Sequence, residues 1–148
     1  MELIYPPVGF HFAVVFELFP QTPRDFKFQG VQGLTVDVET EEFKEGGENR
    51  FVHKLPVRTK YSEITLKRGL FIGSGIILWC KNAIENFDFQ PTNLTITLLN
   101  EEHIPVAGWY IVNAYPISWS VSDFNAEQSS VVIESIKLNY NYFKILKI

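Results

Sequence analysis

Hydrophobic and polar residues alternate in several short stretches of the chain, a pattern that predicts strands. Residues 10–19 form an apolar run with many aromatic and β-branched side chains, which favours a strand. Residues 34–40 alternate strictly, with polar side chains on one face and Leu34, Val36 and Val38 on the other. Because successive side chains of a strand point to opposite faces, this stretch predicts a half-buried strand.

Two more strands are predicted in the middle and second half of the chain. Residues 61–68 alternate, with Ile64 and Leu66 facing inward and charged or hydroxyl side chains facing outward. Residues 106–115 form another strand, and Pro116 is expected to end it or to mark a sheet edge. Each of these stretches has the length of an ordinary strand in a globular protein.

The last third of the chain predicts strands with one irregularity. Residues 92–99 place alternate apolar side chains on one face. Residues 130–140 break phase, because two apolar residues face one way and three face the other: Val131 and Ile133, then Ile136, Leu138 and Tyr140. A bulge, or a strand covered on both faces, would explain the change. Residues 143–148 are apolar for a chain end, so we expect them to be docked.

The hydrophobic period changes from two to three or four after residue 74, which predicts the one convincing helix. Ser74 is the expected N-cap, because its hydroxyl can accept hydrogen bonds from the first turn. The apolar face of this helix is predicted to consist of Ile76, Ile77, Cys80, Ala83, Ile84 and Phe87. About seven strands and one helix predict a mainly β fold, an antiparallel β-barrel or β-sandwich with one packed α-helix.

Length and composition favour a single globular domain over residues 1–148. The chain is 46% hydrophobic and 20% charged, which is ordinary for a domain that buries its own core. The net charge of −4 argues against a general nucleic-acid binder. No apolar run reaches about 18 residues and the first residues do not resemble a signal peptide, so we expect assembly in the cytoplasm.

Candidate chemistry is sparse. Cys80 has no second cysteine to pair with, and we expect a buried thiol. His11, His53 and His103 are scattered, without the spacing of metal ligands. The glycines at 46 and 47 lack the Lys-Ser or Lys-Thr of a phosphate loop, and no nucleophile elbow is present. We therefore predict no enzyme, with no catalytic, cofactor-binding or metal-binding residues.

The stretch between the strands ending near Glu42 and starting near Tyr61 is the most unusual part of the sequence. These residues, about 43–60, are too many for an ordinary hairpin connection of two to five residues. They are also too apolar for a disordered linker, because they include Phe43, Phe51, Val52, Leu55 and Val57. Apolar surface on a long exposed loop indicates an interaction site.

Charges within this region are separated along the sequence. Acids dominate residues 37–48 and bases dominate residues 50–68. Opposed patches on one chain would suit head-to-tail contact with an identical copy, and such contacts build rings or filaments. The alternative is a long loop that folds back onto its own domain. Candidate inter-subunit and inter-ring contacts are Phe43, Phe51, Lys54, Leu55, Pro56, Arg58 and Lys60.

Several motifs, in order along nearly the whole chain, resemble the tail tube protein family of contractile phages and phage-like contractile injection systems. They are Phe-His-Phe at 10–12, Gly33-Leu34, Glu45-Gly46-Gly47, Lys54-Leu55-Pro56, Tyr61 to Gly69, and the Asn-Ala-x-Pro-x-x-Trp signature formed by Asn113, Ala114, Pro116 and Trp119. Residues 131–140 resemble the closing strand of the family. One departure is Val57, which stands where many members have glycine.

This resemblance implies a β-barrel subunit with one helix, of which six copies form a ring and rings stack into a tube inside a sheath. It implies sheath and baseplate or hub proteins as partners, with possible cargo in the lumen. The loop at 43–60 would reach a neighbouring subunit or ring. A tube-initiator ring protein that joins the baseplate hub to the tube is the alternative within the family. From a different class, a β-sandwich ligand-binding module stays open, because the chain is 15% aromatic.

Overall fold

The computed structural model describes residues 10–21, 23–43, 46–47, 53–122 and 132–147. Its elements follow in the order β1 (His11–Phe16), η1 (Pro23–Phe26), β2 (Lys27–Phe28), β3 (Gly30–Gln32), β4 (Val36–Phe43), β5 (His53–Tyr61), β6 (Ile64–Gly69), α1 (Gly75–Asn86), β7 (Thr92–Leu99), β8 (Pro105–Val121), β9 (Ile133–Asn139) and β10 (Tyr142–Lys147). The prediction of a mainly β fold with one α-helix is confirmed.

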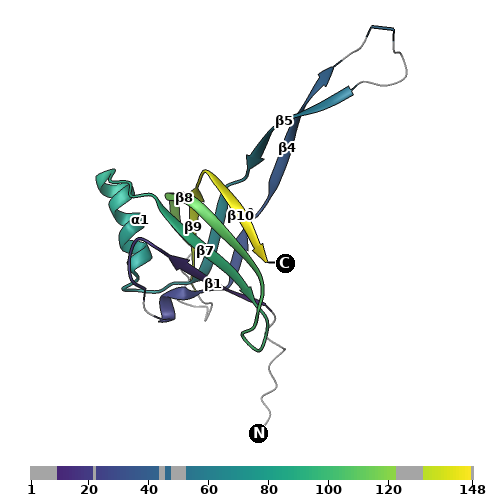
Figure 1. The fold of residues 1–148 in the computed structure, drawn as a ribbon. Coiled ribbons are helices and arrows are strands. Elements are labelled where there is room, and N and C mark those ends of the chain that lie inside the picture. The colour runs from purple at the N-terminus through teal and green to yellow at the C-terminus, as the bar shows by residue number, and fades with distance from the viewer. Residues whose placement is uncertain (1–9, 22, 44–45, 48–52, 123–131, 148) are drawn as a thin grey trace.

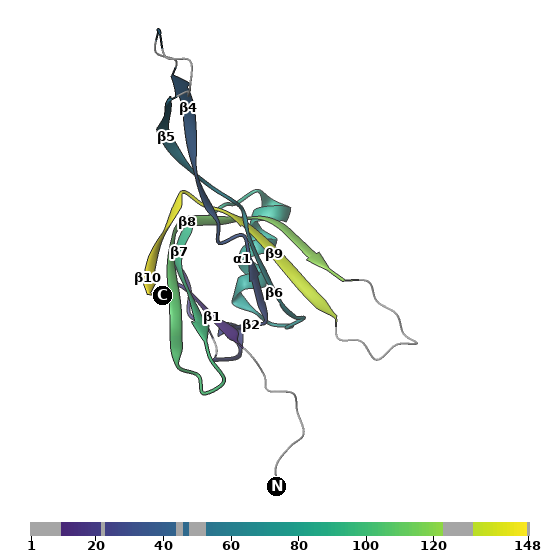
Figure 2. The ribbon, with the colours of Figure 1, turned by 90° about the vertical axis from the view of Figure 1, so that its right-hand side faces the viewer.

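Eight of the strands form one antiparallel sheet that bends over a single core (Figure 1 and Figure 2). The strand order is β2-β1-β7-β8-β9-β6-β3, and β10 pairs with the first half of the long strand β8. The two ends of this path, β2 and β3, are separated along the chain only by Gln29. The result is sandwich-like, which is one of the two predicted arrangements.

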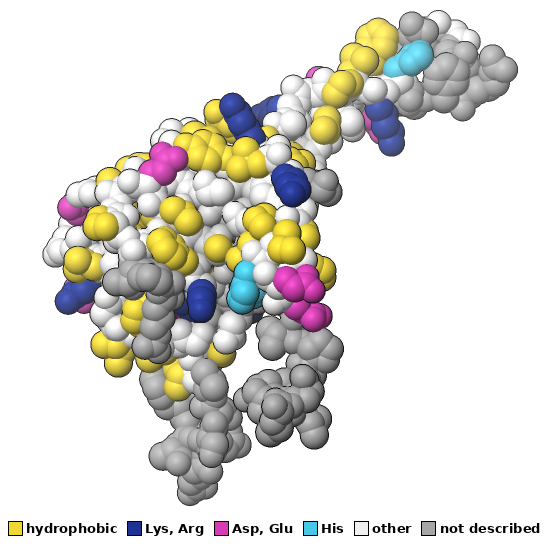
Figure 3. Space-filling model, turned by 60° about the horizontal axis from the view of Figure 1, so that its bottom comes forward, with side chains coloured by type: hydrophobic (Ala, Val, Ile, Leu, Met, Phe, Trp, Pro, Cys, Tyr) yellow, Lys and Arg dark blue, Asp and Glu magenta, His cyan; other side chains and the backbone are white. Residues whose placement is uncertain are grey.

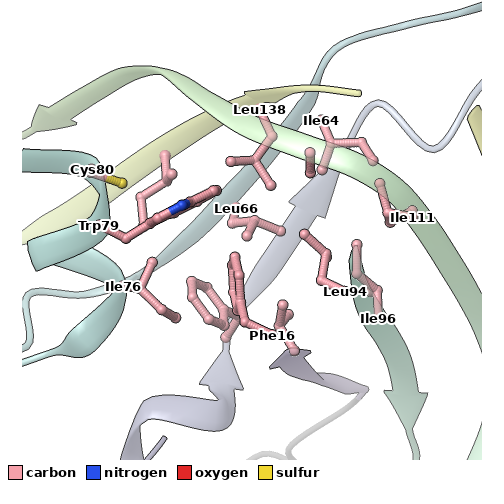
Figure 4. Packing of buried hydrophobic residues seen from close by; sticks show 14 of the residues in the cluster. Phe16, Ile64, Leu66, Ile76, Trp79, Cys80, Leu94, Ile96, Ile111 and Leu138 are labelled. Atoms are coloured by element: carbon pink, nitrogen blue, oxygen red, sulfur yellow. The ribbon is translucent and has the colours of Figure 1, made fainter. Parts of the chain in front are cut away.

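The core lies between the bent sheet and α1 (Figure 4). Ile64 and Leu66 of β6 are fully buried, as the alternation of residues 61–68 predicted. They contact a cluster to which most elements contribute, including Phe16, Leu94, Ile96, Ile111, Ile136 and Leu138. The helix adds Ile76, Trp79 and Cys80 to this cluster. Apolar burial of this extent supplies the main driving force for folding.

The helix begins where it was predicted to begin, but its inner face differs from the prediction. Ser74 is the N-cap, and its hydroxyl accepts hydrogen bonds from the backbone N–H groups of Ile76 and Ile77. The predicted inward residues Ile84 and Phe87 are 53% and 82% exposed. The buried stripe is instead Ile76, Trp79, Cys80 and Ala83, at helical spacings of three and four. The predicted inward residue Ile77 is half-buried at the border of this stripe.

Two predictions about the late strands are corrected. Pro116 does not end its strand, because β8 continues to Val121; the register shifts between Pro116 and Ser118, a bulge that accommodates the missing N–H. The phase break near residue 133 reflects a buried charge. In β9 the inward positions are Glu134, Ile136 and Leu138, so an acidic residue occupies a core position where an apolar one was expected.

Strands β4 and β5 form a separate two-stranded sheet that projects from the body (Figure 1). β5 begins at His53, inside the segment that was predicted to be a loop, so the long connection is a hairpin with a shorter tip. The predicted half-burial of β4 is wrong, because Val36 and Val38 are 41% and 56% exposed. The docked C-terminal segment is confirmed by β10, which pairs with β8.

Candidate functional site

The projecting hairpin, which we call the arm, consists of β4 and β5 and is built from a continuous antiparallel ladder. Val36 lies opposite Tyr61 at the body, and Phe43 lies opposite His53 at the far end. A register shift after Glu39 inserts one extra residue into β5, which twists the hairpin. Eight residues of β4 at about 3.3 Å each span roughly 26 Å, so the arm reaches well beyond the body.

Gly33 is the point at which the chain turns from the main sheet into the arm. Its φ of +91° is a conformation that other residues rarely adopt. A Cβ atom at this position would lie 1.9 Å from the carbonyl oxygen of Glu63. This oxygen belongs to the backbone, so it cannot move aside as a flexible side chain could. The Gly33 carbonyl oxygen accepts a 2.7 Å hydrogen bond from the N–H of Thr35. Glycine in the Gly-Leu motif is therefore explained by the close approach of two chain segments.

Aromatic side chains hold the base of the arm against the body. The ring centroid of Tyr61 lies 5.0 Å from that of Phe143 on β10 and 6.0 Å from that of Tyr140. The Tyr140 hydroxyl donates a 2.5 Å hydrogen bond to the carbonyl oxygen of Ser62. Burial, followed by the proximity of Tyr61, raises the pKa of Tyr140 to about 12. The hydroxyl thus remains protonated and able to donate at any ordinary pH.

From this base to its far end, the arm carries large apolar side chains that the described chain leaves about half exposed. They are 41–56% exposed: Val36, Val38, Phe43, Leu55 and Val57. Figure 3 shows hydrophobic side chains following one another along the arm. Neither strand pairs with a strand of the main sheet within the described residues, so β4 and β5 are both edge strands. Exposed edges and apolar side chains together indicate an interaction surface.

Charges that are separated along the sequence are brought together across the arm. Glu39 and Arg58 form an ion pair with an Nε–Oε2 distance of 2.9 Å. The ladder also places Asp37 opposite Lys60, and Glu42 opposite Lys54. The acidic and basic patches predicted from the sequence are therefore not separate surfaces, because the hairpin pairs them.

The predicted contact residues that the structure describes all lie on the arm and are exposed: Phe43, Lys54, Leu55, Pro56, Arg58 and Lys60. Phe51 lies outside the described residues. The register divides the described ones between faces, because Leu55 shares the face of Glu41, whereas Pro56 shares the face of Thr40. The predicted set is thus one continuous structural element, with side chains on both faces of a thin hairpin.

A second cluster of polar residues lies inside the body, where sequence reasoning had missed it. Arg68 of β6 belongs to the basic stretch of residues 50–68, which was expected to form a contact patch, but it is 3% exposed. Its Nε lies 2.9 Å from Oε2 of Glu134, and its Nη1 lies 2.7 Å from Oδ1 of Asp25. Its Nη2 donates to the Ser74 hydroxyl at 2.8 Å. We call these four residues the buried ion cluster.

Further donors complete the buried ion cluster. The indole N–H of Trp119 donates to Oε1 of Glu134 at 2.9 Å, and the N–H of Gly75 donates to Oδ2 of Asp25 at 3.2 Å. The Ser74 hydroxyl donates to Oδ1 of Asp25. Two carboxylates thus face one guanidinium, and the N-terminus of α1 supplies part of the remaining positive potential. Among the described residues, no buried side-chain N or O atom lacks a hydrogen-bond partner.

Strand alternation carried a signal for this cluster. Arg68 has the same parity as the inward residues Ile64 and Leu66, and Glu134 has the same parity as Ile136 and Leu138. A basic and an acidic residue, each in line with buried positions, predict a buried pair. Three stretches of the sequence that lie far apart in the chain meet here, because Arg68 of β6 and Trp119 of β8 both donate to the Glu134 carboxylate of β9.

Other candidate chemistry is limited. Cys80 is buried, as expected, and burial, followed by the charge of Glu134, raises the pKa of its thiol to about 12. Such a thiol stays protonated and is a poor nucleophile. Within the described ranges no group of three or more His, Cys, Asp or Glu side chains is placed to hold a metal ion. The described helix is not long and apolar enough to cross a membrane.

Comparison with known proteins gives a consistent result. The family model described as T4-like virus tail tube protein gp19 matches residues 8–144. A chain of the anti-feeding prophage (AFP) baseplate superposes with a TM-score of 0.79 at 28% identity, covering 99% of this chain and 98% of that one. A chain of the sheath-tube complex of an extracellular contractile injection system, PVC, in the extended state gives 0.72 at 25% identity, covering 97% and 91%.

More distant structures share the fold alone. A type six secretion system protein superposes with a TM-score of 0.66 at 11% identity, covering 93% of this chain and 83% of that one. No match was found among curated protein sequences. The two neighbours with higher identity, by contrast, are chains of multi-subunit particles, a baseplate and a sheath-tube complex.

Proposed function

Because this chain belongs to the T4-like virus tail tube protein gp19 family, we propose that it is a structural subunit of the inner tube of a contractile injection system or phage tail, which forms hexameric rings that stack into a conduit. Residues 1–148 act as one tail-tube-like domain. The family and the structural neighbours are tail tube proteins with structural roles, and this chain works as an assembly unit and not as an enzyme.

The exposed apolar surface of the arm is the observation that carries this proposal. Large apolar side chains such as Leu55, at 53% exposed, are held on a thin hairpin that the body of the same copy does not cover. Full burial of such a side chain is worth about 1.5–3 kcal/mol, and because these are already about half buried, covering the rest of each stabilises an interface by roughly half of that. A second copy is the occupant that best explains them, because ring and stack formation presents the same surface to the same partner in every subunit.

The inter-subunit and inter-ring contacts are Phe43, Phe51, Lys54, Leu55, Pro56, Arg58 and Lys60. Sheath and baseplate or hub proteins of the same particle are the remaining partners, and cargo occupies the lumen. Neighbours whose structures are described as a baseplate and a sheath-tube complex support these partners. Membership of a phage tail or contractile particle is supported by the same relatives, with assembly in the cytoplasm beforehand.

A second candidate is a tube-initiator ring protein that joins the baseplate hub to the tube. The observation that favours it is the higher similarity to a chain of the anti-feeding prophage baseplate, with a TM-score of 0.79, than to a chain of the PVC sheath-tube complex, with 0.72. An initiator would form a single ring and stop, whereas rings of a tube subunit would continue to stack. Electron microscopy of purified assemblies distinguishes the two candidates by the length of the stacks, because an initiator gives short particles and a tube subunit gives long tubes.

Shortening the arm tests the proposal. Glu39 and Arg58 lie opposite each other in the ladder, so replacing residues 40–57 with Asn-Gly closes the hairpin with a two-residue turn. We expect this variant to fold with an unchanged thermal midpoint, because those of the removed residues that the structure describes are mainly exposed. Negative-stain microscopy and light scattering should show rings or stacks for the intact chain and neither for the variant.

Two point variants make the test specific. Leu55→Ser together with Val57→Ser removes apolar surface while keeping the hairpin, and we expect at least a tenfold higher concentration for assembly. Glu41→Gln is the matched control, since Glu41 lies opposite Leu55 in the ladder but carries no apolar surface. Stacked rings from the shortened variant would exclude the arm as the contact, and an intact chain that stays monomeric at high concentration would exclude the tube function.

A further inference from the structure

Two histidines that are far apart in the sequence meet at the end of the molecule opposite the arm. His11 begins β1, and His103 lies in the turn between β7 and β8. Nε2 of His11 lies 3.0 Å from Nδ1 of His103, and their rings meet edge to face at 74°. The first side chain is half-buried and the second is exposed, so the pair is accessible to ions in solution. Figure 1 shows this turn and the arm at opposite ends.

The turn holds His103 in an unusual conformation that aims its ring at His11. The φ of His103 is +62°, in the left-handed region that non-glycine residues rarely occupy. The turn is fixed by Asn100, whose side-chain oxygen accepts hydrogen bonds from the N–H groups of Glu102 and Ile104 at 2.9 and 3.0 Å. The N–H of His103 donates to the carbonyl oxygen of Asn100 at 3.0 Å. Strained backbone that positions a ligand-bearing side chain is typical of binding sites.

We propose that His11 and His103 form a two-imidazole chelate for a divalent transition-metal ion of the copper or nickel type. Imidazole nitrogen is a ligand that these ions prefer. In the ion-free pair, one ring donates its N–H to the lone pair of the other. When an ion binds, the donor ring takes its other tautomer, so that both nitrogens present lone pairs and no proton is released.

The distance between the nitrogens indicates which ions fit. Two nitrogens 3.0 Å apart, each about 2.05 Å from a shared ion, subtend about 94° at that ion. This angle is close to the right angles of square or octahedral coordination and smaller than the tetrahedral angle that zinc prefers. The remaining positions would be filled by water, and Glu101 lines the same cavity as the two histidines.

A two-ligand site needs no third protein ligand, and this agrees with the lack of any three-residue metal cluster in the described part of the chain. It also predicts moderate affinity and competition by protons, because only imidazoles with free lone pairs can bind. Among divalent ions, affinity should follow the order copper, nickel and then manganese, with magnesium not bound. The proposal is independent of ring formation, since both ligands come from one copy.

Paramagnetic broadening in NMR spectra of the untagged chain tests the site. Adding CuCl₂ in substoichiometric amounts should broaden the ring-proton signals of His11 and His103 beyond detection while those of His53, on the arm, remain. Calorimetric titration with NiCl₂ should give one ion per chain. Glutamine at either position, His11→Gln or His103→Gln, should weaken binding at least tenfold, whereas the matched control His53→Gln should bind as the unchanged chain does.

Each result decides the proposal. Equal broadening of all three histidines, or no broadening at all, would overturn it, as would unaltered nickel affinity in both glutamine variants. If a variant proves unstable, the spectrum of the unchanged chain still gives the answer, because it identifies the ligands without a substitution.

Discussion

The arm and the buried ion cluster contain the same chemical pair in opposite surroundings. Arg58 and Glu39 of the arm have an Nε–Oε2 distance of 2.9 Å, and so do Arg68 and Glu134 of the cluster. The side chains of the first pair are 71% and 42% exposed, whereas those of the second are 4% and 0% exposed. The contacting atoms and their distance are the same in the two pairs, whereas their exposure to water differs.

That difference decides what each pair does. Exposed pairs contribute little, because water solvates both ions almost as well as the partner does. A buried pair costs a large desolvation free energy, and it is tolerated only when every lone pair and proton finds a partner. The cluster meets that condition through Ser74, Trp119 and Asp25. It therefore fixes the positions of β6, β9, η1 and the start of α1, while the arm remains free to contact another chain.

The largest effect is expected from Arg68→Ala. The substitution leaves Asp25 and Glu134, which are 2% and 0% exposed, without their cation. Two uncompensated buried carboxylates should destabilise the fold by about 3–5 kcal/mol. Chemical denaturation monitored by tryptophan fluorescence measures this loss, because Trp79 belongs to the core and Trp119 contacts Glu134.

A matched control shows whether the loss comes from unpaired charge. Adding Asp25→Asn and Glu134→Gln to Arg68→Ala removes the repelling carboxylates, and we expect much of the lost stability to return. If Arg68→Ala lowers the unfolding free energy no more than Arg58→Ala does, burial of the pair does not matter and the comparison between the two regions fails.

An intermediate effect is expected from Ser74→Ala. The hydroxyl caps α1 through Ile76 and also contacts Arg68 and Asp25. Its loss should cost about 1–2 kcal/mol, the upper part of the range for an N-cap. Thermal unfolding followed by circular dichroism measures the change. Ser74→Asp keeps a cap but adds a third carboxylate to the cluster, so its stability should be lower than that of Ser74→Asn.

An unchanged midpoint in Ser74→Ala would contradict the role of this residue as the link between helix and cluster. The expected order of losses is therefore Arg68→Ala, then Ser74→Ala, then the arm variants. Such an order follows from the number of buried polar groups that each substitution leaves without a partner.

Local alternation was enough to predict most strands, the helix start and the inward residues Ile64 and Leu66. It failed where an element leaves the body or where a charge lies inside it. The alternation of β4 was read as half-burial, but a hairpin that projects into solvent has the same pattern with its apolar face uncovered. Period two identifies the faces of a strand, and only the tertiary arrangement decides what covers each face.

Contacts between distant segments were also beyond reach of the sequence. His11 and His103 looked unrelated, because the register of β1, β7 and β8 brings them together only in the folded chain. The acids and bases of the arm are separated along the sequence, so they suggested two separate patches. The sequence did not show where the hairpin turns, and so it did not show that β4 and β5 lie side by side. Once β5 begins at His53, the same residues pair across the ladder. Register, and not composition, determines which charges meet.

The smallest effect on stability is expected from Arg58→Ala, and this variant sharpens the comparison most. Removing an ion pair whose arginine is 71% exposed should change the unfolding free energy by less than about 0.5 kcal/mol. A double-mutant cycle with Glu39→Gln should give a coupling of similar size, against several-fold more for Arg68 and Glu134. If high salt removes the coupling on the arm but not in the cluster, the difference between the two coupling energies comes from exposure to solvent, because salt screens only the exposed pair. Equal couplings in the two regions would mean that the pairs do not differ in the way that their exposure requires.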